Sequence, residues 1–260
     1  MSLIPGSSSA PSIHPNGIAS GSVATPTPLL IPYGITGQIG NVWASSSTAQ
    51  TLVNSDNDIQ IFTPTAAHDV NLPTTSVASG RAFYIVNRGG YALTIKSSGG
   101  NTVVSPSTGT VSNGIYLVRA LQAAPTTAAH WQVEYVNETG TWSPSVGGSA
   151  TYTTNSGFYN RVNNIVHIRA QLTINLIGTG STSVVSGLPF TSATTSINSS
   201  VYIGYWNGLA ASYVYLSGIV GSASSTFTLT GATAAAAGLT IGPAALGNSA
   251  RIDFSSTYQI

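Results

Sequence analysis

The sequence predicts an all-β chain made of an extended N-terminal arm and two antiparallel β-sandwich-like domains. Short runs alternate between apolar and polar residues, which is the period-two pattern of half-buried strands. Gly, Ser and Asn separate these runs, as they do at turns between strands. We find no convincing amphipathic helix, because the run of four alanines at 234–237 is short and lies between Thr and Gly.

Residues 1–40 are predicted to be the arm. Six prolines spread through this segment exclude a regular helix, and its sparse apolar residues follow no period. A flexible tail is one interpretation, and an arm that becomes ordered against a partner is the other. Leu29, Leu30, Ile31 and Tyr33 favour the second interpretation, because a pure linker would not need an apolar cluster.

Residues 41–139 are predicted to form a β-rich stem domain. The apolar runs 83–86 and 93–95 flank an Asn-Arg-Gly-Gly segment, which predicts a β-hairpin. The run HWQVEYV predicts a strand with Trp131, Val133 and Tyr135 on one face.

After that strand, a break at residues 139–148 divides the body, and residues 140–260 are predicted to form a C-terminal β-sandwich knob. In 165–177 six apolar residues fall on one face and five polar residues on the other, as in a long half-buried strand. The last ten residues repeat this alternation, so they are expected inside a sheet.

Composition excludes several classes of function. The chain carries only 13 charged residues, where about 65 would be usual for 260 residues, and 37 Ser and 32 Thr take their place. A net charge of +1 argues against nucleic acid and anionic lipid as partners. An apolar fraction of 42% argues against disorder, and the absence of Cys excludes disulfides and thiolate metal sites.

The N-terminus shows no basic segment followed by an apolar run, so we expect no signal peptide. The longest apolar stretch, 231–247, is broken by Gly and Pro and is shorter than the roughly 20 residues of a membrane span. We therefore expect synthesis in the cytoplasm without membrane insertion.

The acidic and histidine residues predict no catalytic site, metal or cofactor, and hence no enzyme. Asp56 and Asp58 are expected in a turn before a strand; a calcium pair is the alternative, but no Gly and Glu follow at calcium-loop spacing. Glu134 is expected on a solvated strand face and Glu138 in a solvated turn. The four His lie dozens of residues apart, and no nucleophile elbow precedes a helix.

The most informative stretch lies between Arg169 and Arg251, where 81 residues contain no charged residue and no His. Within it, Tyr205, Trp206 and Asn207 precede a Gly and are expected at an exposed turn. Aromatic rings beside amides and hydroxyls suit the faces of sugars, so we expect this turn to bind a receptor saccharide.

Three other tyrosines of that stretch, Tyr202, Tyr213 and Tyr215, lie in strand-like runs and are expected in the core. The lack of charge also fits contact between subunits, because buried Ser, Thr and Asn can be satisfied by hydrogen bonds whereas buried unpaired charges cost several kcal/mol each.

The second half resembles the C-terminal domains of bacteriophage tail fibres and related virion receptor-binding proteins. The matching features are Trp142 and Pro144 before a Gly pair, then Gly157, Tyr159 and Arg161 before the long alternating strand, the turn 187–190, and a last strand ending in Tyr258. The region 53–136 is also similar to a β-domain of phage fibres. Collagen-like repeats, heptad shafts and His-x-His pairs are missing, so a short fibre or a capsid spike, such as a head fibre, fits as well as a true tail fibre.

The resemblance implies a non-enzymatic homotrimer in the virion, assembled in the host cytoplasm. The arm would attach it to other virion proteins of the tail, baseplate or capsid through Leu29, Leu30, Ile31 and Tyr33, and the knob would attach it to a host surface glycan. A capsid decoration or cement protein is the main alternative, and a polysaccharide depolymerase is the second.

Overall fold

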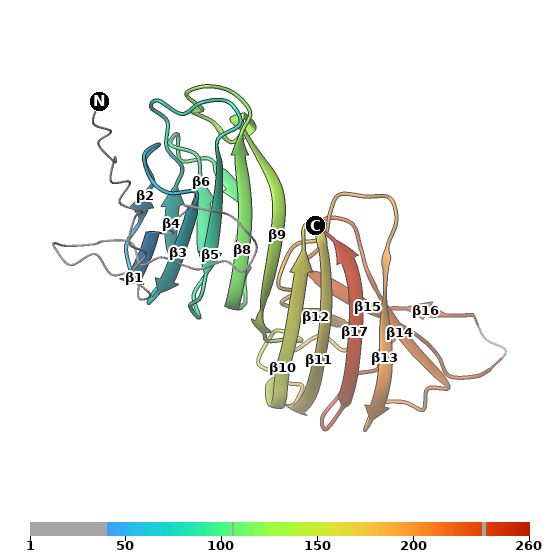
Figure 1. The fold of residues 1–260 in the computed structure, drawn as a ribbon. Coiled ribbons are helices and arrows are strands. Elements are labelled where there is room, and N and C mark those ends of the chain that lie inside the picture. The colour runs from blue at the N-terminus through green and yellow to red at the C-terminus, as the bar shows by residue number, and fades with distance from the viewer. Residues whose placement is uncertain (1–40, 106, 236–237) are drawn as a thin grey trace, which may run out of the picture.

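The computed structural model describes residues 41–105, 107–235 and 238–260 of the chain. Over these residues the chain forms strands and one short helical turn, which confirms the all-β class (Figure 1). No helix in the described part is long and apolar enough to cross a membrane. The elements are β1 (Asn41–Ser46), β2 (Gln50–Thr51), β3 (Ile59–Pro64), β4 (His68–Asn71), β5 (Ala82–Asn87), β6 (Leu93–Lys96), β7 (Thr102–Val104), β8 (Thr110–Ala120), η1 (Ala128–His130), β9 (Trp131–Trp142), β10 (Thr151–Val162), β11 (Ile165–Leu176), β12 (Val184–Ser186), β13 (Ser199–Asn207), β14 (Tyr215–Val220), β15 (Thr226–Ala232), β16 (Thr240–Ile241) and β17 (Arg251–Gln259).

In the stem, the chain alternates between two sheets that enclose one core. β1, β3 and β5 lie parallel in the larger sheet, while β2, β4 and β6 lie parallel in the four-stranded sheet. Leu52, Phe62 and Val70 come from successive segments and meet in that core. The predicted antiparallel arrangement is therefore wrong for the first part of the stem. Antiparallel pairing begins only with β7 on β6 and β8 on β5.

The segment predicted to be a hairpin, β5 and β6, is one of the places where the chain passes from one sheet to the other. The two strands lie in different sheets, and Phe83 of β5 and Ile95 of β6 are buried in the same core. Neither Gly89 nor Gly90 has the positive φ that two-residue hairpin turns require. The hairpin prediction is wrong because the two apolar runs bury their side chains by facing each other across the core, instead of pairing side by side in one sheet.

Strand β9 is shared by the stem and the knob. It pairs with β8 along its length, and residues 137–142 also pair with β10 on the other side. The break expected at 139–148 therefore begins inside a strand, which continues to Trp142.

A bulge in β9 changes which side chains face the stem core. Tyr135 is opposite Leu117 and Val133 is opposite the next residue of β8, so Glu134 is an extra residue. As a result Tyr135 lies with Leu117 on the side away from the buried Trp131. Val133 is opposite the buried Val118 but is itself exposed. The prediction of one common face is wrong for Tyr135, because the bulge interrupts the period of two between Val133 and Tyr135.

The knob continues the larger sheet with antiparallel strands in the order β10-β11-β17-β13-β14-β15-β12. The two predicted long strands are confirmed as β11 and β17, with Val166, Ile168, Leu172, Ile174, Ile252, Phe254 and Tyr258 buried. The sheet folds back on itself, because Phe227 of β15 packs edge-on against Phe254 of β17 with ring centroids 4.9 Å apart. The knob core lies between these two layers.

Both cores lie on the same side of the larger sheet. Val136 belongs to the stem core and Trp142 to the knob core, and buried residues alternate regularly between them along β9. The opposite side, which we call the outer face, is therefore continuous from the stem to the knob.

Candidate ligand-binding face

The outer face of the knob carries two rows of polar and aromatic side chains. The first row crosses five strands and consists of Phe158, Arg169, Ser255, Tyr202 and Ser217. The second lies two residues further along the strands and consists of Asn160, His167 and Thr257. These residues face outward because their neighbours Tyr159, Ile168 and Ser256 face inward and are buried.

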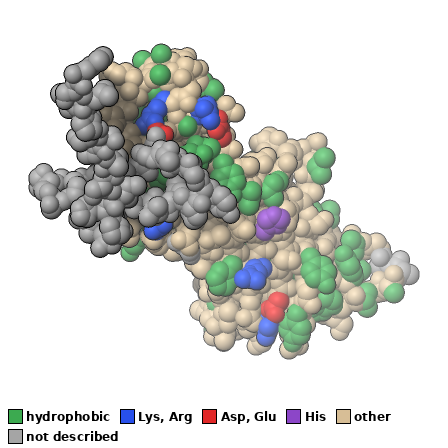
Figure 2. Space-filling model, in the orientation of Figure 1, with side chains coloured by type: hydrophobic (Ala, Val, Ile, Leu, Met, Phe, Trp, Pro, Cys, Tyr) green, Lys and Arg blue, Asp and Glu red, His purple; other side chains and the backbone are tan. Residues whose placement is uncertain are grey.

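A groove of about 1160 Å³ runs along the two rows and reaches Tyr215 on β14. Three of its aromatic side chains, Phe158, Tyr202 and Tyr215, are 52%, 70% and 50% exposed, whereas the fourth, Tyr159, is buried. In Figure 2 separate hydrophobic patches stand out on a largely uncharged knob surface. The groove is thus an aromatic surface without a protein partner among the described residues.

The ionisable side chains of the groove, apart from its tyrosines, are basic. The Arg169 guanidinium lies over the Phe158 ring, 5.3 Å from its centroid. His167 Nδ1 lies 2.8 Å from Thr257 Oγ1, a hydrogen bond that holds the imidazole against β17. No Asp or Glu is among the described residues that line the groove.

Beside the groove, the next row of the outer face holds a closed charge pair. Tyr205 is opposite Asp253, and Asp253 is opposite Gln171. Arg251 donates to Asp253 at 3.0 and 2.7 Å, and its guanidinium lies 4.9 Å from the Tyr205 ring centroid. The hydrogen bonds to Asp253 raise the pKa of Arg251, so this guanidinium is engaged by a carboxylate within the protein.

The predicted receptor residues Tyr205, Trp206 and Asn207 are the last three residues of β13 instead of a turn. Tyr205 faces outward next to the groove. Trp206 points the other way and packs partly buried against the knob core. Asn207 is exposed, and its Oδ1 accepts a hydrogen bond from the Gly208 amide at 2.9 Å, where the chain turns with positive φ.

Two of the tyrosines expected in the core, Tyr202 and Tyr215, are on the outer face, so that prediction is wrong. The signal was present, because Tyr202 lies between the buried residues Val201 and Ile203 and must face the other way. Tyr213, by contrast, packs against the knob core. Phe158 and Arg169 also alternate with buried residues, but their pairing depends on strand register, which the pattern does not contain.

The predicted anchoring residues Leu29, Leu30, Ile31 and Tyr33 lie outside the described residues.

Glu138 is a buried carboxylate at the seam between stem and knob, which contradicts its predicted place in a solvated turn. It is 1% exposed on β9. Tyr116 donates to its Oε2 at 2.8 Å and Tyr159 donates to its Oε1 at 2.6 Å. Burial raises the pKa of Glu138, and the two hydrogen bonds and nearby Arg161 oppose this increase. The prediction failed because β9 continues through Glu138 and turns its side chain inward.

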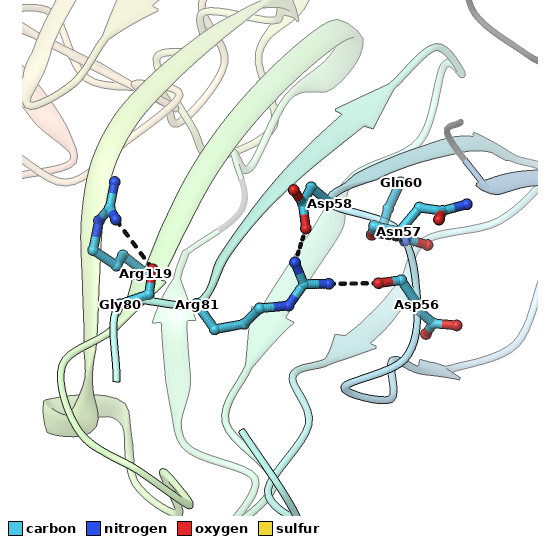
Figure 3. A network of polar contacts seen from close by, with 7 residues as sticks. All are labelled: Asp56, Asn57, Asp58, Gln60, Gly80, Arg81 and Arg119. Carbon is cyan, nitrogen blue, oxygen red and sulfur yellow. Dashed lines mark hydrogen bonds and ion pairs between the residues drawn. The ribbon is translucent and has the colours of Figure 1, made fainter. Parts of the chain in front are cut away.

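The Asp56–Asp58 segment precedes strand β3, and its charges are engaged within the stem (Figure 3). Asp58 forms an ion pair with Arg81, which also donates to the backbone carbonyl of Asp56. The Asp56 carboxylate accepts from the Val53 amide at 2.7 Å, as in a turn.

Glu134 projects from the outer face of the stem, where it forms an ion pair with Arg119. Arg119 also donates to the Gly80 carbonyl at 3.1 Å (Figure 3). This pairing lowers the pKa of Glu134, so its carboxylate remains charged and compensated.

Comparison with known proteins gives one match. No family model and no curated protein matches the chain. Among solved structures, the crystal structure of the Dettilon tailspike protein (gp208) is similar, with a TM-score of 0.42 and 12% identity over 85% of this chain. The chain spans 43% of the length of that protein.

Proposed function

We propose that this protein is a fibre or spike of a phage virion that attaches to the host surface by binding saccharide in the knob groove. The observation that carries the proposal is the groove itself, in which Phe158, Tyr202 and Tyr215 stand exposed among Ser and Thr hydroxyls. Flat apolar rings beside hydrogen-bonding groups complement the C–H faces and hydroxyl edges of a sugar. The resemblance of the second half to virion receptor-binding domains supports the biological setting.

A saccharide bound in the groove would not be centred on Tyr205, Trp206 and Asn207, the residues predicted from the sequence. Tyr205 borders the groove from the next row of the outer face, and Asn207 lies one row further away. Trp206 packs against the core beneath them. We therefore assign direct sugar contact to Phe158, Tyr202 and Tyr215, and a flanking position to Tyr205.

Attachment would depend on many weak contacts. A homotrimer would present three grooves, and several trimers on a particle would raise the effective affinity without catalysis. We assign the contact between copies to the outer face of the stem, where Tyr84, Leu117 and Tyr135 form one cross-strand row with Ile115 beside it. The arm, through residues 1–40, would attach the trimer to other virion proteins.

Glycan binding by the purified full chain tests the site. Tyr215→Ala and Tyr202→Ala should each reduce binding to immobilised host glycan at least about tenfold, because each removes a stacking ring. Tyr91→Ala is the matched control, because Tyr91 on the stem and Tyr215 on the knob have nearly the same exposed fraction, 49% and 50%. Equal losses from Tyr91→Ala and Tyr215→Ala would refute the groove as the binding site. If only Tyr205→Ala reduced glycan binding, the binding site would be the one predicted from the sequence and not the groove.

The subunit contact has a separate test. Tyr84→Asp should reduce the mass measured by sedimentation from trimer toward monomer, because three carboxylates would be brought into one apolar contact. Tyr91→Asp should leave the mass unchanged. A trimer that survives Tyr84→Asp would refute this surface as the contact.

The alternatives predict other results. Removal of residues 1–40 should abolish incorporation into particles and leave cell binding intact; a capsid cement protein would show no cell binding at all. Release of reducing ends from host polysaccharide would assign a depolymerase.

A further inference from the structure

We infer that the groove selects acidic saccharides, with Arg169 as the group that binds their carboxylate or phosphate. This inference rests on the proposed saccharide function and specifies its ligand. Three independent features of the structure support it: the missing partner of Arg169, the position of its guanidinium, and the charge of the knob.

Arg169 has no acidic partner among the described residues. The other two arginines of the knob have partners within the protein. Arg251 forms an ion pair with Asp253. Arg161 interacts electrostatically with Glu138 and donates to the Ser105 carbonyl at 3.2 Å. The Arg169 guanidinium forms no ion pair or side-chain hydrogen bond within the described chain, and it lies over the Phe158 ring. Its N–H groups are thus available to a ligand.

The position of Arg169 suits a ligand that stacks on the aromatic rings of the groove and forms an ion pair with the guanidinium. The Arg169 guanidinium lies over the Phe158 ring, while its N–H groups remain free for an oxyanion. Carboxylate and phosphate both match this fork in a bidentate way. Arg169 is also in the same cross-strand row as Tyr202, so one sugar chain can reach both.

The electrostatic surroundings favour an anion. Residues 140–260 contain Arg161, Arg169, Arg251 and Asp253, a net charge of +2, while residues 41–139 contain four basic and five acidic residues. No described carboxylate lines the groove to repel a ligand anion. Because the site is open to solvent, the attraction should weaken as salt screens it.

Calorimetry with the full chain tests the inference with three probes: a galacturonic acid trisaccharide, a galactose trisaccharide of the same linkage, and the latter carrying one phosphate. We expect one or both acidic probes to bind at least about tenfold more tightly than the neutral one, with affinity that falls as salt rises. Whichever acidic probe shows the preference identifies carboxylate or phosphate as the recognised group.

Variants separate the role of Arg169 from general charge. Arg169→Gln should bring the acidic probe to the affinity of the neutral one, and Arg169→Lys should recover only part of the loss. Arg88→Gln removes the same charge from an exposed site on the stem and should change nothing. Melting temperature and sedimentation mass, unchanged in each variant, would show that folding and assembly are intact.

Two results overturn the inference in different ways. Equal affinity for neutral and acidic probes, lost in Tyr202→Ala, would refute acid selection and leave saccharide binding in place. Failure of all three probes to bind would refute both. A change of sedimentation mass in Arg169→Gln would instead identify the groove as a contact between copies and refute the ligand site.

Discussion

The stem and the knob share one sheet but use their charges differently. The stem holds nine of the 13 charged residues, and Arg81, Lys96 and Arg119 are each in an ion pair. The knob holds four, and Arg169 stays without an acidic partner among the described residues. A sparsely charged surface with an uncompensated arginine in an aromatic groove is suited to selective binding, whereas three of the four basic residues of the stem are compensated by carboxylates.

The strongest test of this comparison is at the seam. Glu138→Ala should lower the free energy of unfolding by about 3–5 kcal/mol, because it leaves a cavity and two buried tyrosine hydroxyls without an acceptor. Glu134→Ala, on the same strand, removes one exposed ion pair and should cost about 1 kcal/mol or less. Denaturant titration followed by tryptophan fluorescence measures both. Equal effects would contradict the buried position of Glu138.

The crossing between β5 and β6 is tested next. Gly89→Ala should cost about 1–3 kcal/mol, because its Cβ would lie 2.5 Å from the Pro64 ring. Gly90→Ala meets no atom within 4 Å and should change stability by less than about 0.5 kcal/mol. Similar costs at the two positions would argue against the crossing and for a hairpin turn.

A smaller effect is expected from pH. Burial raises the pKa of Glu138 above its ordinary value of 4.5, so the folded protein holds this proton more tightly than the unfolded chain. The resulting stabilisation is complete below about pH 4.5 and is lost as pH rises through the raised pKa. Wild type should therefore lose stability relative to Glu138→Gln over that range. A difference that is constant, or that runs the other way, would contradict the raised pKa.

The smallest effect on stability should come from the groove. Tyr202→Ala should change the free energy of unfolding by less than about 0.5 kcal/mol, because 70% of Tyr202 is exposed. Phe254→Ala, in the core on the neighbouring strand, should cost about 3–5 kcal/mol. A large cost for Tyr202→Ala would mean that the groove belongs to the fold and not to a ligand.

Prediction from sequence succeeded where one strand could be considered alone. The alternation in β11 and β17 predicted most of the buried side chains correctly, since a half-buried strand needs one apolar face whatever its neighbours are. Leu176, at the end of β11, was predicted on that face and is exposed. Prediction failed for β5 and β6, because two apolar runs around a turn can pair in one sheet or face each other across a core. Tyr135 was assigned to the wrong face because one inserted residue, Glu134, shifts the period after Val133.

The candidate site was predictable only in part. Its chemistry was evident, since an uncharged stretch rich in tyrosine pointed to a polar, aromatic surface. The residues that form it were not predictable, because Phe158 and Arg169 come beside the distant Tyr202 only through the register of four strands.

The low charge, the absence of Cys and the period-two pattern therefore determined by themselves an all-β protein with few charged side chains and no disulfides. The tertiary structure decided the rest: parallel crossings in the stem, a carboxylate buried at the seam, and an arginine left without an acidic partner among aromatic rings. Local patterns report only whether a side chain is inside or outside. Which strands are neighbours, and hence which side chains meet, depends on contacts between distant segments that no local pattern encodes.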